Sequence, residues 1–276
     1  MPAANERALE KAKSLPADAV IFDLEDAVAP DAKEAARAAA CTAAASGQYG
    51  RRLLTIRCNG LDTPWGLDDL AAIAVSTASA VVVPKVSSVD HLDQVAARLD
   101  AAGAPDSLTV WAMIETPTAI FDARAIAAHP RVSVLLLGTN DLARELRLPL
   151  VAGRRALLPH LATALLAARE AGKTILDGVF NDVKDLDGFA EECAQGVEFG
   201  FDGKTLIHPT QVDIANQAWA PSATDVDQAR RVIAAFDEAV ADGRGVVTVD
   251  GRMIENLHVV NAQRTLAIAE AIAALD

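Results

Sequence analysis

The chain of 276 residues carries 25 basic and 38 acidic side chains, a formal net charge of −13, and 51% of its residues are hydrophobic. This composition is typical of a globular protein and excludes a disordered one. A chain this acidic is a poor candidate for binding nucleic acid or an anionic membrane surface, so any anionic ligand must meet a local cluster of Arg and Lys.

The cysteines exclude two further classes of site. Cys41, Cys58 and Cys193 are odd in number, far apart and without a CxxC motif, which argues against a disulfide framework and against a thiolate zinc site. The sequence has no apolar run of roughly 18 residues that could span a membrane, and residues 1–13 are a charged amphipathic stretch unlike a signal peptide. We therefore expect a cytoplasmic protein.

Short apolar runs alternate along the chain with Ala-rich segments of helical spacing. The runs predict seven strands, over residues 19–26, 53–59, 80–86, 108–116, 132–141, 174–180 and 202–209. The segments between them predict helices, among them residues 33–45, 90–102, 117–128 and 157–171. Strands that are apolar on both faces and followed by helices indicate a parallel sheet covered by helices.

This alternation favours an α/β fold of the (β/α)8 TIM-barrel type over a doubly wound open sheet. The chain length is typical of the barrel, and the polar residues gather at one place. A barrel of this kind needs eight strands, and the chain begins directly in a predicted helix over residues 5–14. We therefore expect the first strand to lie upstream of Met1.

The pattern changes after His208. Ser222 precedes a predicted helix whose apolar positions repeat at intervals of three and four residues, followed by the strand-like run VVTVDG and a final helix over residues 256–275. We expect residues 1–220 to form a catalytic barrel domain and residues 221–276 a C-terminal helical lid.

Nearly every predicted strand ends in a polar or ionisable side chain, and in a barrel the chemistry lies at the carboxyl ends of the strands. These residues are Glu25, Asp26, Arg57, Asn59, Lys85, Glu115, Asn140, Asp141, Asp177 and His208. Carboxylates without a Cys/His cluster indicate a hard cation with oxygen ligands, most simply Mg²⁺ on Glu115 and Asp141. Glu25 and Asp26 either orient metal-bound water and Arg57 or form a salt bridge with a neighbouring base.

A series of motifs in the same order resembles the citrate lyase β-subunit and malyl-CoA lyase family of CoA-ester lyases, within the HpcH/HpaI aldolase superfamily. The motifs span essentially the whole chain: LEDAV, RCNGLDTPWG, VPKV, MIETP, GTNDLA, DGVF and GFDGKTLIHPTQ. The tail, with VDG followed by ENLH, is most similar to the (3S)-malyl-CoA thioesterases of that family. The resemblance implies a TIM barrel with a C-terminal lid, a CoA-thioester substrate, and assembly into homotrimers or dimers of trimers.

The resemblance also implies roles for individual residues. The metal ligands fall on Glu115 and Asp141, with Mg²⁺ as the cofactor and Mn²⁺ as a substitute. The catalytic and substrate-binding arginine falls on Arg57. The CoA phosphates are expected at Arg7 and Lys11, which are one helical turn apart and so lie on one face. The further expected substrate contacts are Asn140, Ile207 and His208.

One departure from the family pattern concerns the predicted lid. Many lyases of the family carry there a catalytic Asp that serves a neighbouring subunit, whereas the matching residue in GRMIENLH is Glu255. The extra methylene shifts the carboxylate by roughly an ångström, enough to change which proton or water it handles. We therefore expect hydrolysis of malyl-CoA to malate and CoA, with Glu255 as the base and Asp26 as a further catalytic candidate.

Three alternatives stay open. The first is a lyase that cleaves malyl-CoA, methylmalyl-CoA or citramalyl-CoA by a retro-Claisen reaction, which would yield glyoxylate or pyruvate in place of malate. The second is a metal-dependent aldolase for free 2-keto acids, against which Arg7 and Lys11 argue weakly, because free acids need no site for CoA phosphates. The third is a citrate lyase β-like subunit that acts only within its complex.

Overall fold

The computed structural model describes residues 1–275 of the chain. The chain divides into two compact units, Met1–Ala218 and Trp219–Asp276. None of the helices within the described residues is long and apolar enough to cross a membrane. The roles predicted for the two parts of the chain, a catalytic domain and a lid, stay predictions.

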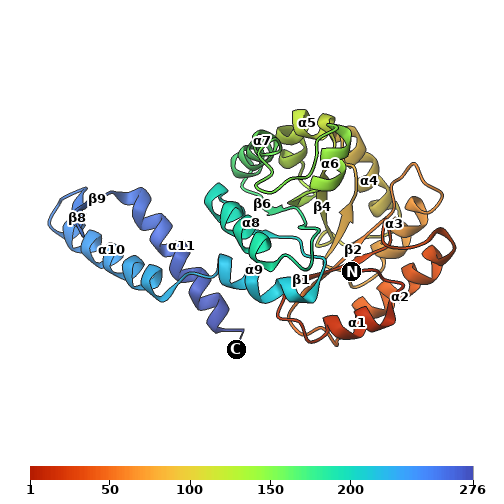
Figure 1. The fold of residues 1–276 in the computed structure, drawn as a ribbon, viewed down its shortest axis with the longest axis horizontal. Coiled ribbons are helices and arrows are strands. Elements are labelled where there is room, and N and C mark those ends of the chain that lie inside the picture. Colours follow the sequence, from red (N-terminus) through yellow and green to blue (C-terminus); the bar gives the residue numbers. More distant parts are fainter. Residues whose placement is uncertain (276) are drawn as a thin grey trace. The chain divides into compact units, whose positions relative to one another are not determined.

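The first unit is built on a parallel sheet of seven strands that curls into a half-barrel, with the strands side by side in chain order (Figure 1). The strands are β1 (Ala19–Asp23), β2 (Leu53–Arg57), β3 (Ala80–Val83), β4 (Thr109–Ile114), β5 (Val132–Leu137), β6 (Thr174–Asp177) and β7 (Gly203–Lys204). All seven predicted strands are confirmed. Each ends before its predicted carboxyl boundary, because the predicted runs also included the residues of the following loop.

Both faces of this sheet are buried. Alternate residues of neighbouring strands form one apolar cluster that includes Val82, Trp111 and Leu136. The residues between them, such as Val81 and Leu135, point to the opposite face and are equally buried. Burial on both faces explains why these strands are continuous apolar runs in the sequence.

Helices flank the curled sheet (Figure 1). They are α1 (Glu6–Ala12), α2 (Lys33–Ala45), α3 (Gly66–Ala74), α4 (Val89–Ala101), α5 (Pro117–Ala128), α6 (Thr139–Glu145), α7 (Leu158–Glu170), α8 (Leu186–Phe199) and α9 (Val212–Trp219). The predicted helices are confirmed to within one or two residues at each end. The prediction that residues 139–141 continue a strand was wrong, because the backbone turns at Gly138 and α6 begins at Thr139.

The first residues of the chain lie along the free edge of β1. The Asp23 amide donates to the Met1 carbonyl at 2.8 Å, and the Ala3 amide donates to the Asp23 carbonyl at 3.0 Å. Pro2 and Asp23 form a parallel bridge. Among the described residues β7 pairs with β6 alone. The described strands therefore form a half-barrel, and closure by an eighth strand stays a prediction.

The second unit contains α10 (Ala223–Ala241), a hairpin of β8 (Val247–Val249) and β9 (Arg252–Ile254), and α11 (Asn256–Ala273). Ser222 precedes α10 as predicted, and it caps the helix, since its side chain accepts the Asp225 amide. The strand β9 was not predicted. The hairpin turns through Asp250 and Gly251, whose φ angles of 49° and 76° suit a tight turn that matches the twist of the two strands.

Candidate functional site

Asp23 and Arg57 form a two-armed ion pair where β1 and β2 end. The two residues are partners in the strand register. Arg57 Nε and Nη2 donate to Asp23 Oδ1 and Oδ2, each at 2.6 Å. Burial raises the pKa of Asp23, but the hydrogen bonds and charge of Arg57 outweigh burial and leave that pKa below its usual value. The Arg57 guanidinium is therefore held in one orientation.

Glu25 extends this pair to the next strand. Its carboxylate forms an ion pair with Arg57 Nη1 at 2.7 Å and accepts a hydrogen bond from Lys85 Nζ at 2.9 Å. Glu25 is buried, whereas Asp26 is exposed to solvent. The two predicted acids therefore have different surroundings: Glu25 pairs with Arg57 and Lys85, and Asp26 contributes only its charge to the raised pKa of Arg57.

Lys85 connects the end of β3 to Glu115. Its amide donates to Glu115 Oε1 at 2.7 Å. The Lys85 backbone has a φ angle of 50°, in the left-handed region that a residue other than glycine enters only at a cost. This conformation aims the amide at Glu115 while the side chain points back to Glu25.

Glu115 is buried, with 2% of its surface exposed. Burial, together with the nearby charges of Asp141 and Glu25, raises the pKa of Glu115 to about 7. The site has room for this side chain only because residue 138 is glycine: a Cβ there would lie 2.3 Å from Glu115 Oε2.

Asp141 lies in the first turn of α6, beside Glu115. Its Oδ1 pairs with the exposed Arg144 side chain at 2.7 Å, a solvent-screened contact that costs little to break. Asn140 exchanges two amide hydrogen bonds with Asn181, at 3.0 and 2.7 Å. These bonds fasten the start of α6 to the loop after β6.

Glu115 and Asp141 fit a hard divalent cation. Both offer carboxylate oxygens, which are the preferred ligands of Mg²⁺. Burial, with smaller contributions from the charges of Asp141 and Glu25, raises the pKa of Glu115, and a bound cation would favour its ionised form. Among the described residues no three His, Cys, Asp or Glu side chains are grouped to hold a metal ion. A cation held by these two carboxylates would take its other ligands from water and substrate oxygens.

Asp177 belongs to a separate, closed ion network. Arg154 Nη1 and Nη2 donate to its two oxygens at 2.6 and 2.8 Å, and Lys204 Nζ donates at 2.9 Å. Burial raises the pKa of Asp177, but Lys204 and Arg154 outweigh burial and lower it below its usual value. Because its oxygens are engaged in the interior, Asp177 has a structural role at the last strands of the sheet.

His208 caps the short helix Pro209–Gln211, since its Nδ1 accepts the Thr210 amide at 3.3 Å. Ile207 is exposed, and its amide donates to Gln211 Oε1 at 3.1 Å. The structure records no hydrogen bond between either residue and the described residues of the rim, so their substrate contacts stay predictions.

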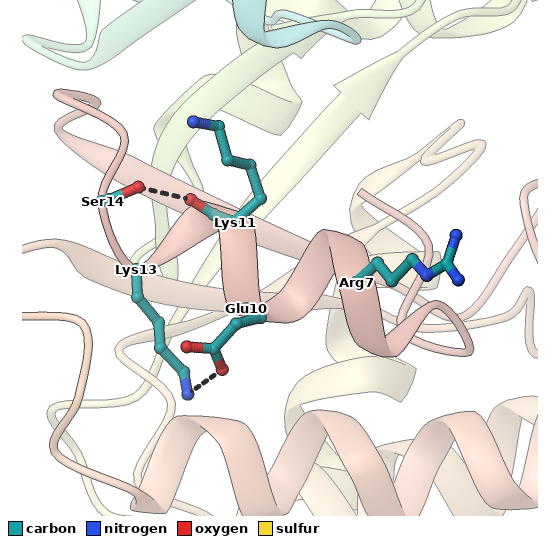
Figure 2. Close-up of a pocket in the computed structure, with 5 residues that line it drawn as sticks. All are labelled: Arg7, Glu10, Lys11, Lys13 and Ser14. Atoms are coloured by element: carbon teal, nitrogen blue, oxygen red, sulfur yellow. Dashed lines mark hydrogen bonds and ion pairs between the residues drawn. The ribbon is translucent and has the colours of Figure 1, made fainter.

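Arg7 and Lys11 line an open hollow of about 540 Å³ on α1, together with Glu10, Lys13 and Ser14. Figure 2 shows that Lys13 turns to Glu10, whereas the side chains of Arg7 and Lys11 extend away from the helix. Neither Arg7 nor Lys11 has a recorded ion pair with the described residues. Two free cations at one hollow suit a phosphate-bearing ligand. Binding of CoA there stays a prediction.

Glu255 lies in the second unit, at the start of α11. Its amide donates to His258 Nδ1 at 3.0 Å, a bond that fixes the first turn of the helix. The Glu255 side chain and the His258 backbone form the other half of a capping box at this helix start. The catalytic role of this carboxylate stays a prediction.

The sequence patterns missed two residues that organise the rim. Asp23 is one, although it ends β1 at the level where Arg57 ends β2. Lys33 is the other: its buried ammonium donates to the carbonyls of Leu24 and Glu25, at 2.9 and 2.8 Å, and to Asn59 Oδ1 at 2.7 Å. A lysine in a predicted helix is expected on the surface, so nothing in the sequence predicts that Lys33 is buried at the rim.

Comparison with known proteins gives consistent matches. The family model described as HpcH/HpaI aldolase/citrate lyase matches residues 1–209. A (3S)-malyl-CoA thioesterase of Cereibacter sphaeroides is 51% identical over 274 residues, 99% of this chain and 94% of that protein. The citrate lyase β subunit of Escherichia coli is 35% identical over 276 residues, 98% of this chain and 91% of that protein. The structure of CitE from Mycobacterium tuberculosis with magnesium, acetoacetate and coenzyme A has a TM-score of 0.80 at 29% identity, covering 98% of this chain and 96% of that one.

Replacing Gly138 with alanine tests how tightly Glu115 is placed. The new Cβ would lie 2.4 Å from Glu115 Cβ, so the carboxylate must move, and a shift of this size reduces turnover by roughly a hundredfold. Magnesium affinity by calorimetry should fall with it. Gly245→Ala is the matched control, because a Cβ there meets nothing within 4 Å. Wild-type magnesium affinity in the Gly138→Ala protein would contradict this placement of Glu115.

The raised pKa of Glu115 predicts a pH-dependent loss of stability in the metal-free protein. The folded state keeps this proton up to a pH of about 7, whereas the unfolded chain releases it near 4.5. The free energy of unfolding should therefore fall as the pH rises through this window. The free energy of unfolding of Glu115→Gln should not fall in this window, and above pH 7 it should exceed the wild-type value by up to about 3 kcal/mol. Urea unfolding in EDTA measures this difference, and a difference independent of pH would contradict it.

Proposed function

The chain belongs to the HpcH/HpaI aldolase/citrate lyase family, and we propose that it is a magnesium-dependent enzyme that hydrolyses (3S)-malyl-CoA to malate and CoA. The observation that carries the proposal is the rim itself, where Glu25 and Lys85 link the fixed guanidinium of Arg57 to Glu115, which lies near Asp141. Identity of 51% to a (3S)-malyl-CoA thioesterase along nearly the whole chain supports the choice of substrate.

Glu115 and Asp141 would hold Mg²⁺, with Mn²⁺ as a substitute. When bound, the cation supplies positive charge for the hydroxyl and carboxylate of the malyl group and for negative charge that develops in the reaction. The magnesium and coenzyme A in the M. tuberculosis CitE structure support this cofactor and the thioester class.

Arg57 would bind the acyl oxygens and stabilise the negative charge on the thioester oxygen as water attacks. Asp23 and Glu25 hold three of its nitrogens before substrate arrives. A donor fixed in advance pays no reorganisation cost in the transition state. Asp26, exposed beside this group, is the further catalytic candidate.

The rest of the substrate would contact both ends of the site. Arg7 and Lys11, which line the hollow on α1, would bind the CoA phosphates. The candidates for contacts with the acyl and pantetheine portions are Asn140, Ile207 and His208.

Glu255 is the proposed general base. It would take a proton from the attacking water, and that proton would leave with the CoA thiolate as the carbon–sulfur bond breaks. The family resemblance supports this role, since the matching residue in many lyases is an Asp of the lid.

The finer architecture belongs to the same proposal. The seven-stranded half-barrel would be completed as a (β/α)8 barrel, residues 221–276 would act as its lid, and the chain would assemble into a homotrimer or a dimer of trimers. The three separate and free thiols, Cys41, Cys58 and Cys193, support a cytoplasmic location.

The second candidate is a lyase that cleaves malyl-CoA, methylmalyl-CoA or citramalyl-CoA between carbon atoms. The observation that favours it is 35% identity to a citrate lyase β subunit, because the same rim could stabilise the enolate that a retro-Claisen cleavage leaves. The products distinguish the two reactions.

Incubation of the pure protein with (3S)-malyl-CoA and Mg²⁺, with and without EDTA, tests the proposal. Malate and free CoA should form only with the metal. Glu255→Gln should abolish malate formation, whereas Glu270→Gln, a change of another acid on α11, should leave it unaffected. Glyoxylate and acetyl-CoA as the products would instead assign the lyase reaction, and no turnover would contradict both.

A further inference from the structure

Lys85 is held in a costly conformation at the centre of the candidate site. Its φ angle of 50° lies in the left-handed region, where a lysine gains nothing that asparagine or glycine would not gain at lower cost. Backbone strain of this kind concentrates at functional sites. The amide would reach Glu115 with any side chain, so the contact at 2.7 Å does not explain why the residue is a lysine.

The Lys85 ammonium group has hydrogen-bond donors that are free to bind a ligand at the rim. Arg57 uses three nitrogens on Asp23 and Glu25, and Nη1 also contacts Met113 Sδ at 3.9 Å. Lys85 Nζ has three donors, of which Glu25 takes one, at 2.9 Å. Its side chain is 45% exposed, against 18% for Arg57. The donors still available to a ligand therefore lie mainly on Lys85.

The surrounding charges make this ammonium the natural partner of an incoming anion. Three carboxylates, of Glu25, Glu115 and Asp141, lie close enough to act on Lys85. Burial lowers the pKa of Lys85, but Glu25 outweighs burial and raises it above its usual value. A substrate carboxylate that approaches this acidic rim needs a fixed positive charge beside the metal ligands, and Lys85 supplies one.

We propose that Lys85 binds the free carboxylate of a dicarboxylic acyl-CoA, and so selects such thioesters over those with an uncharged acyl chain. The inference rests on the proposed function, because it names a specificity-determining residue of the same site. It adds a partner for the substrate carboxylate besides Arg57, most of whose donors Asp23, Glu25 and Met113 engage.

The test compares succinyl-CoA with butyryl-CoA, which differ only in the terminal carboxylate. Calorimetric titration in the presence of Mg²⁺ should show that the wild type binds succinyl-CoA at least about tenfold more tightly, the usual gain from a charge-assisted hydrogen bond. Lys85→Met should lose this preference, and Lys85→Arg should keep part of it. An unchanged ratio in Lys85→Met, or no preference in the wild type, would overturn the proposal.

Lys85→Asn separates binding from folding. Asparagine tolerates a positive φ, and its backbone amide can still donate the hydrogen bond to Glu115. The variant should therefore melt at or above the wild-type temperature and still lose the preference for succinyl-CoA. A marked fall in melting temperature would instead make Lys85 a structural brace for Glu25 and overturn the proposal. Because neither thioester has to be turned over, the affinity ratio stands even if the assay with malyl-CoA fails.

Discussion

The rim of the sheet depends on one constraint, the burial of the Glu115 carboxylate beside two other acids. Removing a carboxylate from water is costly unless hydrogen bonds or a positive charge compensate. The Lys85 amide provides one hydrogen bond to Oε1, and the pKa raised to about 7 shows that this compensation is incomplete. The missing Cβ of Gly138 and the left-handed backbone of Lys85 both serve this arrangement. A cation bound to Glu115 would supply the missing compensation for the burial of this carboxylate.

The second feature of the rim is the Arg57 guanidinium, which ion pairs hold in one orientation. Asp23 and Glu25 both pair with Arg57, and Lys33 donates a hydrogen bond to the backbone carbonyl of Glu25. The rim therefore contains two kinds of charged group: the carboxylate oxygens of Glu115 and Asp141, and the fixed guanidinium of Arg57. Thioester hydrolysis and carbon–carbon cleavage both need these two elements, so the distinction between them rests on the residue that handles the proton, for which Glu255 is the candidate.

The sequence predicted the sheet and many residues of its rim, for a physical reason. Strands buried on both faces must be apolar throughout, so β3 and β5 stand out as uninterrupted runs, and the polar residue after each run marks the edge of the sheet. Other features depend on quantities that no single-residue pattern carries. The pairing of Asp23 with Arg57 follows from strand register, and the path of Lys85 follows from one backbone angle. The start of α6 at Thr139 follows from the turn at Gly138, which a strand pattern conceals.

The most direct test of a cation site at Glu115 is the proton that leaves when the metal binds. Mg²⁺ titrated into the protein in two buffers of different ionisation enthalpy gives the number of protons released. At pH 6 most Glu115 side chains are protonated, since their pKa is about 7, so binding should release close to one proton, and at pH 8.5 almost none. Binding without proton release at pH 6, or equal release at both values, would contradict the account.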